Sequence, residues 1–217
     1  MEIRTIEQLT DVTDPAWGEI QEAIKAAPVA VDVLPTDSGA DTLHKLQVTT
    51  HSTLGGIAYN CGGILIDHGW VRLYGGGGAQ LPSIAEASGI TEPSVPGALI
   101  FGHDVLGGRF AIDGGALGIS PGEVCYFSPD GLEWEGLDMG HSGFVHAFLG
   151  GATTKFYDLF RWEGWEADTK ALKPDQGFMV FPPLFSRENP EVDFITRTAV
   201  PMQEIFAFYE TSAASNS

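Results

Sequence analysis

Short apolar runs separated by glycine-rich turns fill the chain from Leu54 to Phe127, and this pattern constrains the fold more than any other feature. Each run has the length of one strand, and the short turns between runs favour antiparallel pairing of neighbours. Asp67-His68-Gly69 and Val105-Leu106-Gly107-Gly108 are expected to be hairpin loops, because glycine adopts the positive φ that such loops need. The runs are Ile57-Ala58-Tyr59, Ile64-Leu65-Ile66, Val71-Arg72-Leu73-Tyr74, Ala98-Leu99-Ile100-Phe101, Arg109-Phe110-Ala111-Ile112 and Val124-Cys125-Tyr126-Phe127.

Helical patterns flank this predicted meander on both sides. Near the N-terminus, Asp14 is expected to cap a helix in which Pro15 takes the first position. After Trp134 the apolar period becomes 3.6, with Ser142 as the expected cap, and Pro201 is expected to begin the last helix. The sequence therefore predicts one α+β domain over residues 1–217, with an antiparallel sheet packed by helices and a frayed tail at 212–217.

The charge of the chain limits its partners. Asp and Glu number 29 against 11 Lys and Arg, which gives a net charge of −18. Binding to the phosphate backbone of a nucleic acid is therefore not expected, and no apolar run approaches the ~20 residues of a membrane span. The acidic surface has two interpretations, a coat that keeps the protein soluble or a surface that docks a basic protein.

The N-terminal residues and the two cysteines predict the cellular compartment of the protein and the state of its thiols. The chain opens on polar residues instead of an apolar signal core, so a cytoplasmic location is expected. Cys61 and Cys125 have no CxxC spacing and have apolar or glycine neighbours, which favours two buried thiols over a disulfide or a metal site. The sequence indicates no cofactor, and the oligomeric state is left open.

Two motifs partly match known signatures, one of a phosphate-binding loop and one of a catalytic nucleophile. Gly75-Gly76-Gly77-Gly78 is followed by Ala79, not by the Lys-Ser/Thr of a phosphate-binding loop, so a flexible surface loop is expected. The segment Gly140–Phe144 resembles a nucleophile elbow, but its second glycine comes one place early, and capping by Ser142 explains it better. No catalytic residue is assigned.

Histidine and aspartate are adjacent at two predicted strand ends, Asp67-His68 and His103-Asp104. Neither pair has the HExxH or HxH spacing of a metal site, so hydrogen-bonded turn histidines are the simpler interpretation. The alternative is a small-molecule or metal-dependent enzyme whose site gathers these four residues from neighbouring turns.

Three tryptophans, at positions 134, 162 and 165, lie among acidic residues. Such a tryptophan ring is either partly buried and structural, or exposed as an anchor that binds a basic partner. The leading hypothesis is a non-enzymatic module that binds a basic protein. The residues expected to form its contact surface are Asp67, His68 and Trp70 at the hairpin, with Glu133 and Trp134 on the strand before the helices.

Five long strings stand out along the chain: Leu46-Gln47-Val48-Thr49-Thr50, Gly63-Ile64-Leu65-Ile66-Asp67-His68-Gly69-Trp70, the segment Asp104–Gly115, Gly122-Glu123-Val124-Cys125-Tyr126-Phe127 and Leu132-Glu133-Trp134. In this order they resemble a bacterial family of unknown function, DUF2625. The resemblance covers nearly the whole chain and implies no activity or catalytic residues.

Residues 98–150 contain, in order, the predicted strand Phe110–Asp113 after a glycine turn, the strand Gly122–Tyr126, in which Cys125 is an inserted residue, and the helix Phe144–Leu149. This order has a more distant resemblance to the SUKH (Smi/Knr-like) superfamily, which includes many toxin-immunity proteins. The early Asn-Gly-Gly of that superfamily is replaced here by Asn60-Cys61-Gly62-Gly63. The resemblance implies an α+β fold and an immunity-like function by protein binding, which is an inference by fold analogy.

Overall fold

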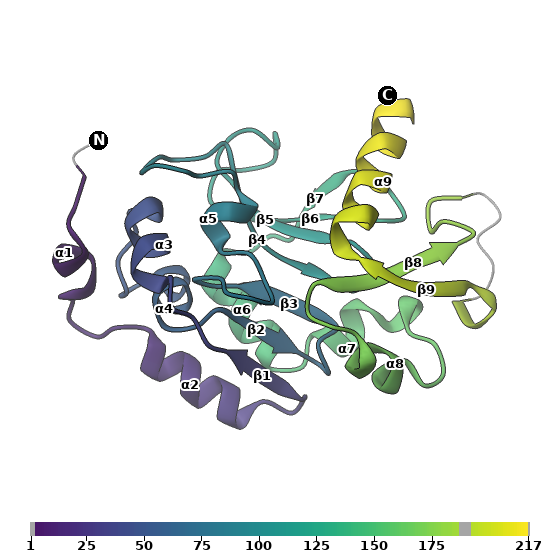
Figure 1. The fold of residues 1–217 in the computed structure, drawn as a ribbon, viewed down its shortest axis with the longest axis horizontal. Helices are drawn as coiled ribbons and strands as arrows, with labels where there is room; N and C mark the ends of the chain where they lie inside the picture. The colour runs from purple at the N-terminus through teal and green to yellow at the C-terminus, as the bar shows by residue number, and fades with distance from the viewer. Residues whose placement is uncertain (1–2, 187–191, 217) are drawn as a thin grey trace.

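The computed structural model describes residues 3–186 and 192–216, and an antiparallel sheet forms the centre of this part of the chain (Figure 1). Its seven strands pair in the order in which they occur in the sequence, so the predicted meander and α+β fold are confirmed. The strands are β1 (Val31–Leu34), β2 (Gly63–Ile66), β3 (Val71–Tyr74), β4 (Ala98–Asp104), β5 (Arg109–Asp113), β6 (Val124–Phe127) and β7 (Trp134–Gly136).

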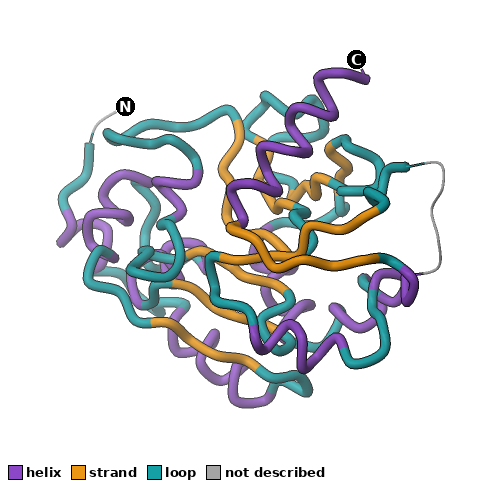
Figure 2. The backbone as a smooth tube through the Cα atoms, turned by 45° about the vertical axis from the view of Figure 1, so that its right-hand side comes forward, coloured by secondary structure: helices purple, strands orange, loops and turns teal. Residues whose placement is uncertain are grey.

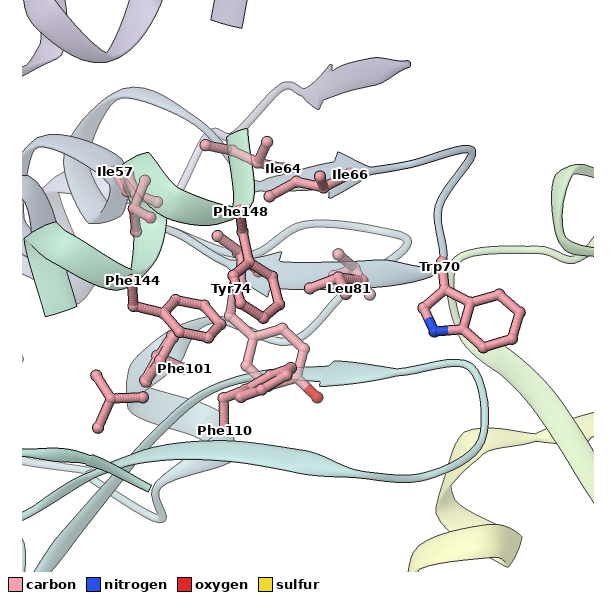
Figure 3. Close-up of a cluster of buried hydrophobic side chains, with 14 of the residues drawn as sticks. Ile57, Ile64, Ile66, Trp70, Tyr74, Leu81, Phe101, Phe110, Phe144 and Phe148 are labelled. Atoms are coloured by element: carbon pink, nitrogen blue, oxygen red, sulfur yellow. The ribbon is translucent and has the colours of Figure 1, made fainter. Parts of the chain in front are cut away.

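The main hydrophobic core lies between this sheet and the helices on one of its faces. Helices α4 (Thr53–Asn60) and α6 (His141–Leu149) pack together there, and α2 (Trp17–Ala26) packs on both. Phe144 and Phe148 of α6 point toward Phe101 and Phe110 of the sheet (Figure 3). The rings of Phe144 and Phe110 are 4.8 Å apart, and those of Phe144 and Phe101 5.3 Å, so aromatic packing dominates this core.

The opposite face of the sheet carries a two-stranded ribbon and the C-terminal helix α9 (Met202–Asn216), which rises from the ribbon (Figure 2). The ribbon pairs β8 (Gln176–Phe181) with β9 (Thr196–Pro201). Helix α9 buries Ile205, Phe206 and Tyr209 there. These residues form a second, smaller cluster with Phe127 and Met202.

The remaining elements are short. They are α1 (Ile6–Thr10), α3 (Gly39–Leu46), α5 (Ile84–Ala87), α7 (Thr153–Phe156), α8 (Trp165–Ala171) and the 3₁₀ turns Asp158–Phe160 and Val192–Phe194. Ser83 and Glu86 close the helical turn α5 with a reciprocal capping box. Within the described residues, no helix combines the length and the apolar character needed to cross a bilayer.

Several local predictions are wrong. The run Ile57-Ala58-Tyr59 belongs to α4, because Ser52 caps that helix by accepting a hydrogen bond from the backbone N–H of Gly55 at 3.0 Å. Asp14 has a φ of 54° and does not cap α2, which begins after Ala16. Ser142 lies inside α6, whose N-cap is Gly140.

At the C-terminus, Pro201 ends β9 and the last helix begins at the next residue. Helix α9 reaches Asn216, so it includes residues 212–216 of the segment expected to fray.

The glycine run at Gly75–Gly78 is packed, which corrects the expectation of a flexible surface loop. Gly75, Gly76 and Gly77 are buried and only Gly78 is exposed. A Cβ atom on Gly75 would overlap the carbonyl oxygen of Cys61, so glycine is needed here for close approach of two backbone segments. Cys61 and Cys125 are both free and buried, as predicted, and burial raises the pKa of the Cys61 thiol to about 12.

Candidate functional site

The loop between β2 and β3 has the hairpin geometry that the sequence predicts, with an unusual backbone. Asp67 and His68 have φ values of 57° and 59°, and Gly69 follows at 83°. Among the described residues, this is the one place where two consecutive non-glycine residues have positive φ. The left-handed region costs a residue with a Cβ atom about 1–2 kcal/mol, a cost that tight hairpin turns impose on their central residues.

The Asp67 side chain is fixed by contacts from the segment that follows α6. Its Oδ2 atom accepts a hydrogen bond from the Thr153 hydroxyl at 2.7 Å and forms an ion pair with Nη2 of Arg161. The side chains of Arg161 and Asp67 are only 11% and 7% exposed. Water screens such a pair weakly, so the pair holds the Arg161 guanidinium firmly at the hairpin.

Tryptophan rings surround the Arg161 guanidinium. Its central carbon lies 4.0 Å from the ring centroid of Trp165 and 5.3 Å from that of Trp70. Trp70 meets Trp165 edge to face at 5.2 Å and lies at the end of the hairpin, apart from the core phenylalanines (Figure 3). The buried indole Nε1 of Trp70 and the buried Nε of Arg161 have no hydrogen-bond partner among the described residues. Buried polar groups of this kind are uncommon and each calls for an explanation.

A groove of 580 Å³ opens above this stack, and we call it the Arg161 groove. Its charged groups are three carboxylates and one guanidinium, so the lining is acidic overall. Leu159, beside Asp158 in the 3₁₀ turn, is 83% exposed, which packing within the chain does not explain. The lining residues are Pro28, Val29, Ala30, Asp67, His68, Thr154, Asp158, Arg161, Trp162, Trp165 and Glu166.

The structure brings together some of the predicted contact residues and separates others. Asp67 and His68 line the Arg161 groove, and Trp70 supports it from below. Trp134 begins β7 and Glu133 precedes it, four strands from β3 and therefore about 19 Å away across the sheet. A single small contact surface does not contain both sets.

The residues of the alternative enzyme site do not converge. His103 and Asp104 are neighbours on β4, so their side chains point to opposite faces of the sheet. Asp104 is fully buried in the main core and accepts hydrogen bonds from the hydroxyls of Tyr126 at 2.7 Å and Tyr157 at 3.0 Å. His103 contacts Tyr74 on the face that carries α9. Over residues 3–186 and 192–216, no three His, Cys, Asp or Glu residues are placed to hold a metal ion.

A further cleft, of 830 Å³, lies where α2 and α6 begin and includes His51, His141 and Ser142. The Ser142 hydroxyl accepts a hydrogen bond from the Thr53 hydroxyl at 3.0 Å. His51 directs Nδ1 at the carbonyl oxygens of Thr13 and Asp14. No imidazole bonds to the Ser142 hydroxyl in the described part of the chain, so the cleft lacks a nucleophile and base in contact.

Sequence reasoning missed the residues that complete the Arg161 groove. Arg161 and Asp67 are 94 positions apart, and no local pattern connects them. The available signal was the segment Arg161–Glu166, in which one arginine and two tryptophans lie among acidic residues. That segment was recognised as a candidate anchor, but its meeting with the hairpin was not predicted.

Comparison with known proteins places the chain in a family. The model of the family described as "Protein of unknown function DUF2625" matches residues 6–205, so the chain belongs to this family, as its sequence predicted. It is 36% identical over 208 residues to the uncharacterized protein YbfG of Escherichia coli strain K12, which covers 94% of each chain. It is 33% identical over 203 residues to an uncharacterized protein of Haemophilus influenzae, covering 88% of this chain and 87% of that protein. No solved structure matches, and the SUKH resemblance stays a prediction.

Proposed function

We propose that this protein is a non-enzymatic binding module that docks a basic, partly apolar segment of a partner protein in the Arg161 groove. The observation that carries the proposal is the combination, in one groove, of a Trp-Arg stack, three carboxylates and the exposed Leu159 on the adjoining turn. The SUKH resemblance gives the proposal its specific form, an immunity-like protein whose partner is a basic toxin.

Charge complementarity supports a basic occupant. Asp158 and Glu166 are exposed and lie on the groove, while the charge of Asp67 is already matched by Arg161. A lysine or arginine of the partner would therefore meet Asp158 and Glu166, of which Glu166 also lies 3.8 Å from Nε2 of His68. The net charge of −18 adds a long-range attraction that accelerates encounter with a basic protein and weakens as salt is added.

The aromatic and apolar groups supply the short-range part of the interaction. Trp165 is half-buried, with one side taken up by Arg161 and by the edge of Trp70. Tryptophan fixed in this way is the kind of residue that carries binding energy at protein interfaces, because it loses little conformational entropy on binding. The exposed Leu159 side chain would pack against an apolar side chain of the partner.

The experiment measures binding of a synthetic peptide in which lysine and leucine alternate. Wild-type protein is compared with two double variants that lose the same number of charges, D158N/E166Q in the groove and E22Q/D41N elsewhere. Glu22 and Asp41 are exposed and pair with lysines on their own helices. Titrations are run at about 50 mM and about 500 mM salt, which span strong and weak screening.

The proposal predicts binding that weakens about ten-fold or more in D158N/E166Q and less than about two-fold in E22Q/D41N. Equal losses in the two double variants would mean that the peptide responds only to overall charge. Binding that does not change with salt would contradict the electrostatic part of the proposal.

A further inference from the structure

A separate cavity of 330 Å³ lies on the other face of the sheet, between α5 and α9. Its volume is at the lower end of the range for small-molecule sites. Its walls combine rings and aliphatic groups with one arginine, one phenol, one amide and two carboxylates. The lining residues are Tyr74, Pro82, Glu86, Ala87, Ile100, Arg109, Gln203, Phe206, Ala207 and Glu210.

Arg109 presents its guanidinium to this cavity from an aromatic cage. The guanidinium carbon lies 5.0 Å from the ring centroid of Phe127, 5.3 Å from that of Phe206 and 5.9 Å from that of Trp134. Its Nη1 atom forms an ion pair with Oε1 of Glu210 at 2.7 Å, and the Glu210 side chain is 58% exposed. An exposed ion pair of this kind is weak, so another carboxylate can replace Glu210 at Nη1 with little loss.

Arg72 of β3 is a second cation on the face of the sheet that carries α9, and it forms no ion pair in the described part of the chain. Arg72 is buried, and its N–H groups donate to the carbonyl oxygens of Gly69, Pro174 and Gln176. Within the described residues no carboxylate forms an ion pair with it. Burial lowers its pKa only to about 10, so Arg72 is still charged at neutral pH. Arg72 does not line the cavity, so it contributes only a positive charge on this face of the sheet, which favours an anion there at longer range.

His103 lies between the two arginines in the sheet. It pairs with Arg72 on β3 and with Arg109 on β5, and it is 2% exposed. Neither of its ring nitrogens has a partner in the described part of the chain. Its ring lies 5.3 Å from that of Tyr74 and 5.7 Å from that of Phe206, the two aromatic walls of the cavity. His103 is not among the lining residues and lies behind these two walls as a buried imidazole without a hydrogen-bond partner in the described part of the chain.

We propose that this cavity binds a small carboxylic acid with one ring. The ligand carboxylate takes the place of Glu210 at Nη1 of Arg109 and accepts a hydrogen bond from the Tyr74 hydroxyl. Its ring packs against Phe206 and Ile100. Glu86 also lines the cavity, but its Oε2 atom is held at the start of α5, where it accepts a hydrogen bond from the backbone N–H of Ser83 at 2.7 Å.

Benzoate is the probe, and its neutral amide, benzamide, is the control for charge. Binding is followed by NMR through the indole N–H of Trp134, which belongs to the Arg109 cage. The variants are E210Q, which removes the competing carboxylate, R109Q, which removes the guanidinium, and E22Q, a control at an exposed ion pair on α2. Thermal unfolding of each variant reports whether it is folded.

The proposal predicts that benzoate binds about two- to five-fold more tightly to E210Q than to the wild type, because an exposed competing pair is removed. Benzamide binding and binding to R109Q are expected to be at least about ten-fold weaker, since the charge-assisted hydrogen bond is lost. E22Q should bind like the wild type.

Failure of benzoate to bind both the wild type and E210Q at about 10 mM, a concentration that detects weak ligands, overturns the proposal. Equal affinity for benzoate and benzamide also overturns it, as does unchanged binding to folded R109Q. If R109Q does not fold, the test rests on the benzoate affinity of E210Q. Benzoate that binds E210Q no more tightly than it binds the wild type contradicts the proposal.

Discussion

Replacing Asp67 by asparagine tests whether the hairpin and Arg161 form one rigid unit. The two side chains are 7% and 11% exposed, so the substitution leaves the Arg161 guanidinium buried without its counter-ion. Removing one partner of such a pair costs about 3 kcal/mol of unfolding free energy. For a chain of this size, that loss corresponds to a Tm lower by about 6–12 °C.

Urea unfolding followed by tryptophan fluorescence measures this loss, because three of the five tryptophans lie at or under the Arg161 groove. The double variant D67N/R161Q completes a thermodynamic cycle with the two single variants. We expect a coupling energy of about 1.5–3 kcal/mol for two side chains in direct contact. E22Q, at an exposed ion pair, should change stability by less than about 0.5 kcal/mol. A D67N variant as stable as E22Q, or strict additivity in the cycle, would refute the reasoning.

Three further predictions follow from single positions. His68→Gly should raise the unfolding free energy by about 1 kcal/mol in urea titrations, since glycine adopts a φ of 59° without steric cost. Gly108→Ala should lower it by about 2 kcal/mol by the same assay, because the new Cβ atom overlaps the Asp104 carboxylate and the Tyr126 hydroxyl. Burial lowers the pKa of His141 to about 4, so between pH 6.5 and 4 the unfolded state binds more protons and stability falls as pH falls. Urea titrations across this window should show that the unfolding free energy of H141Q falls less with decreasing pH than that of the wild type. Parallel plots of unfolding free energy against pH for the two proteins would contradict the prediction.

The sheet was predictable because its signals are local. A hairpin needs a short turn in which a residue adopts positive φ. Gly69 takes this conformation between β2 and β3, and Gly107 takes it between β4 and β5. Helix α4 was not predictable in the same way, since Leu54, Ile57 and Ala58 are all buried and their apolar run fits a strand as well as a buried helix.

The candidate site was predictable only in its hairpin half. Asp67 and His68 stand out as a polar pair at a strand end, and the structure places both on the groove. Arg161 and Trp165 come from a segment whose position depends on the packing of α6, α7 and β8, so no sequence pattern connects them to Asp67. The tight packing of Gly75 depends likewise on the backbone of Cys61, which only the folded chain brings near.

The most direct test of the central claim, that the Arg161 groove docks a basic and partly apolar segment, is an NMR titration of the five tryptophan indole N–H signals with the lysine-leucine peptide. Trp165 lines the groove, whereas Trp17 lies on α2 and Trp134 on β7. The account predicts that the Trp165 signal shifts in a saturable manner at low salt while those of Trp17 and Trp134 stay in place. Binding that leaves Trp165 unmoved, or that shifts all three signals alike, would contradict the account.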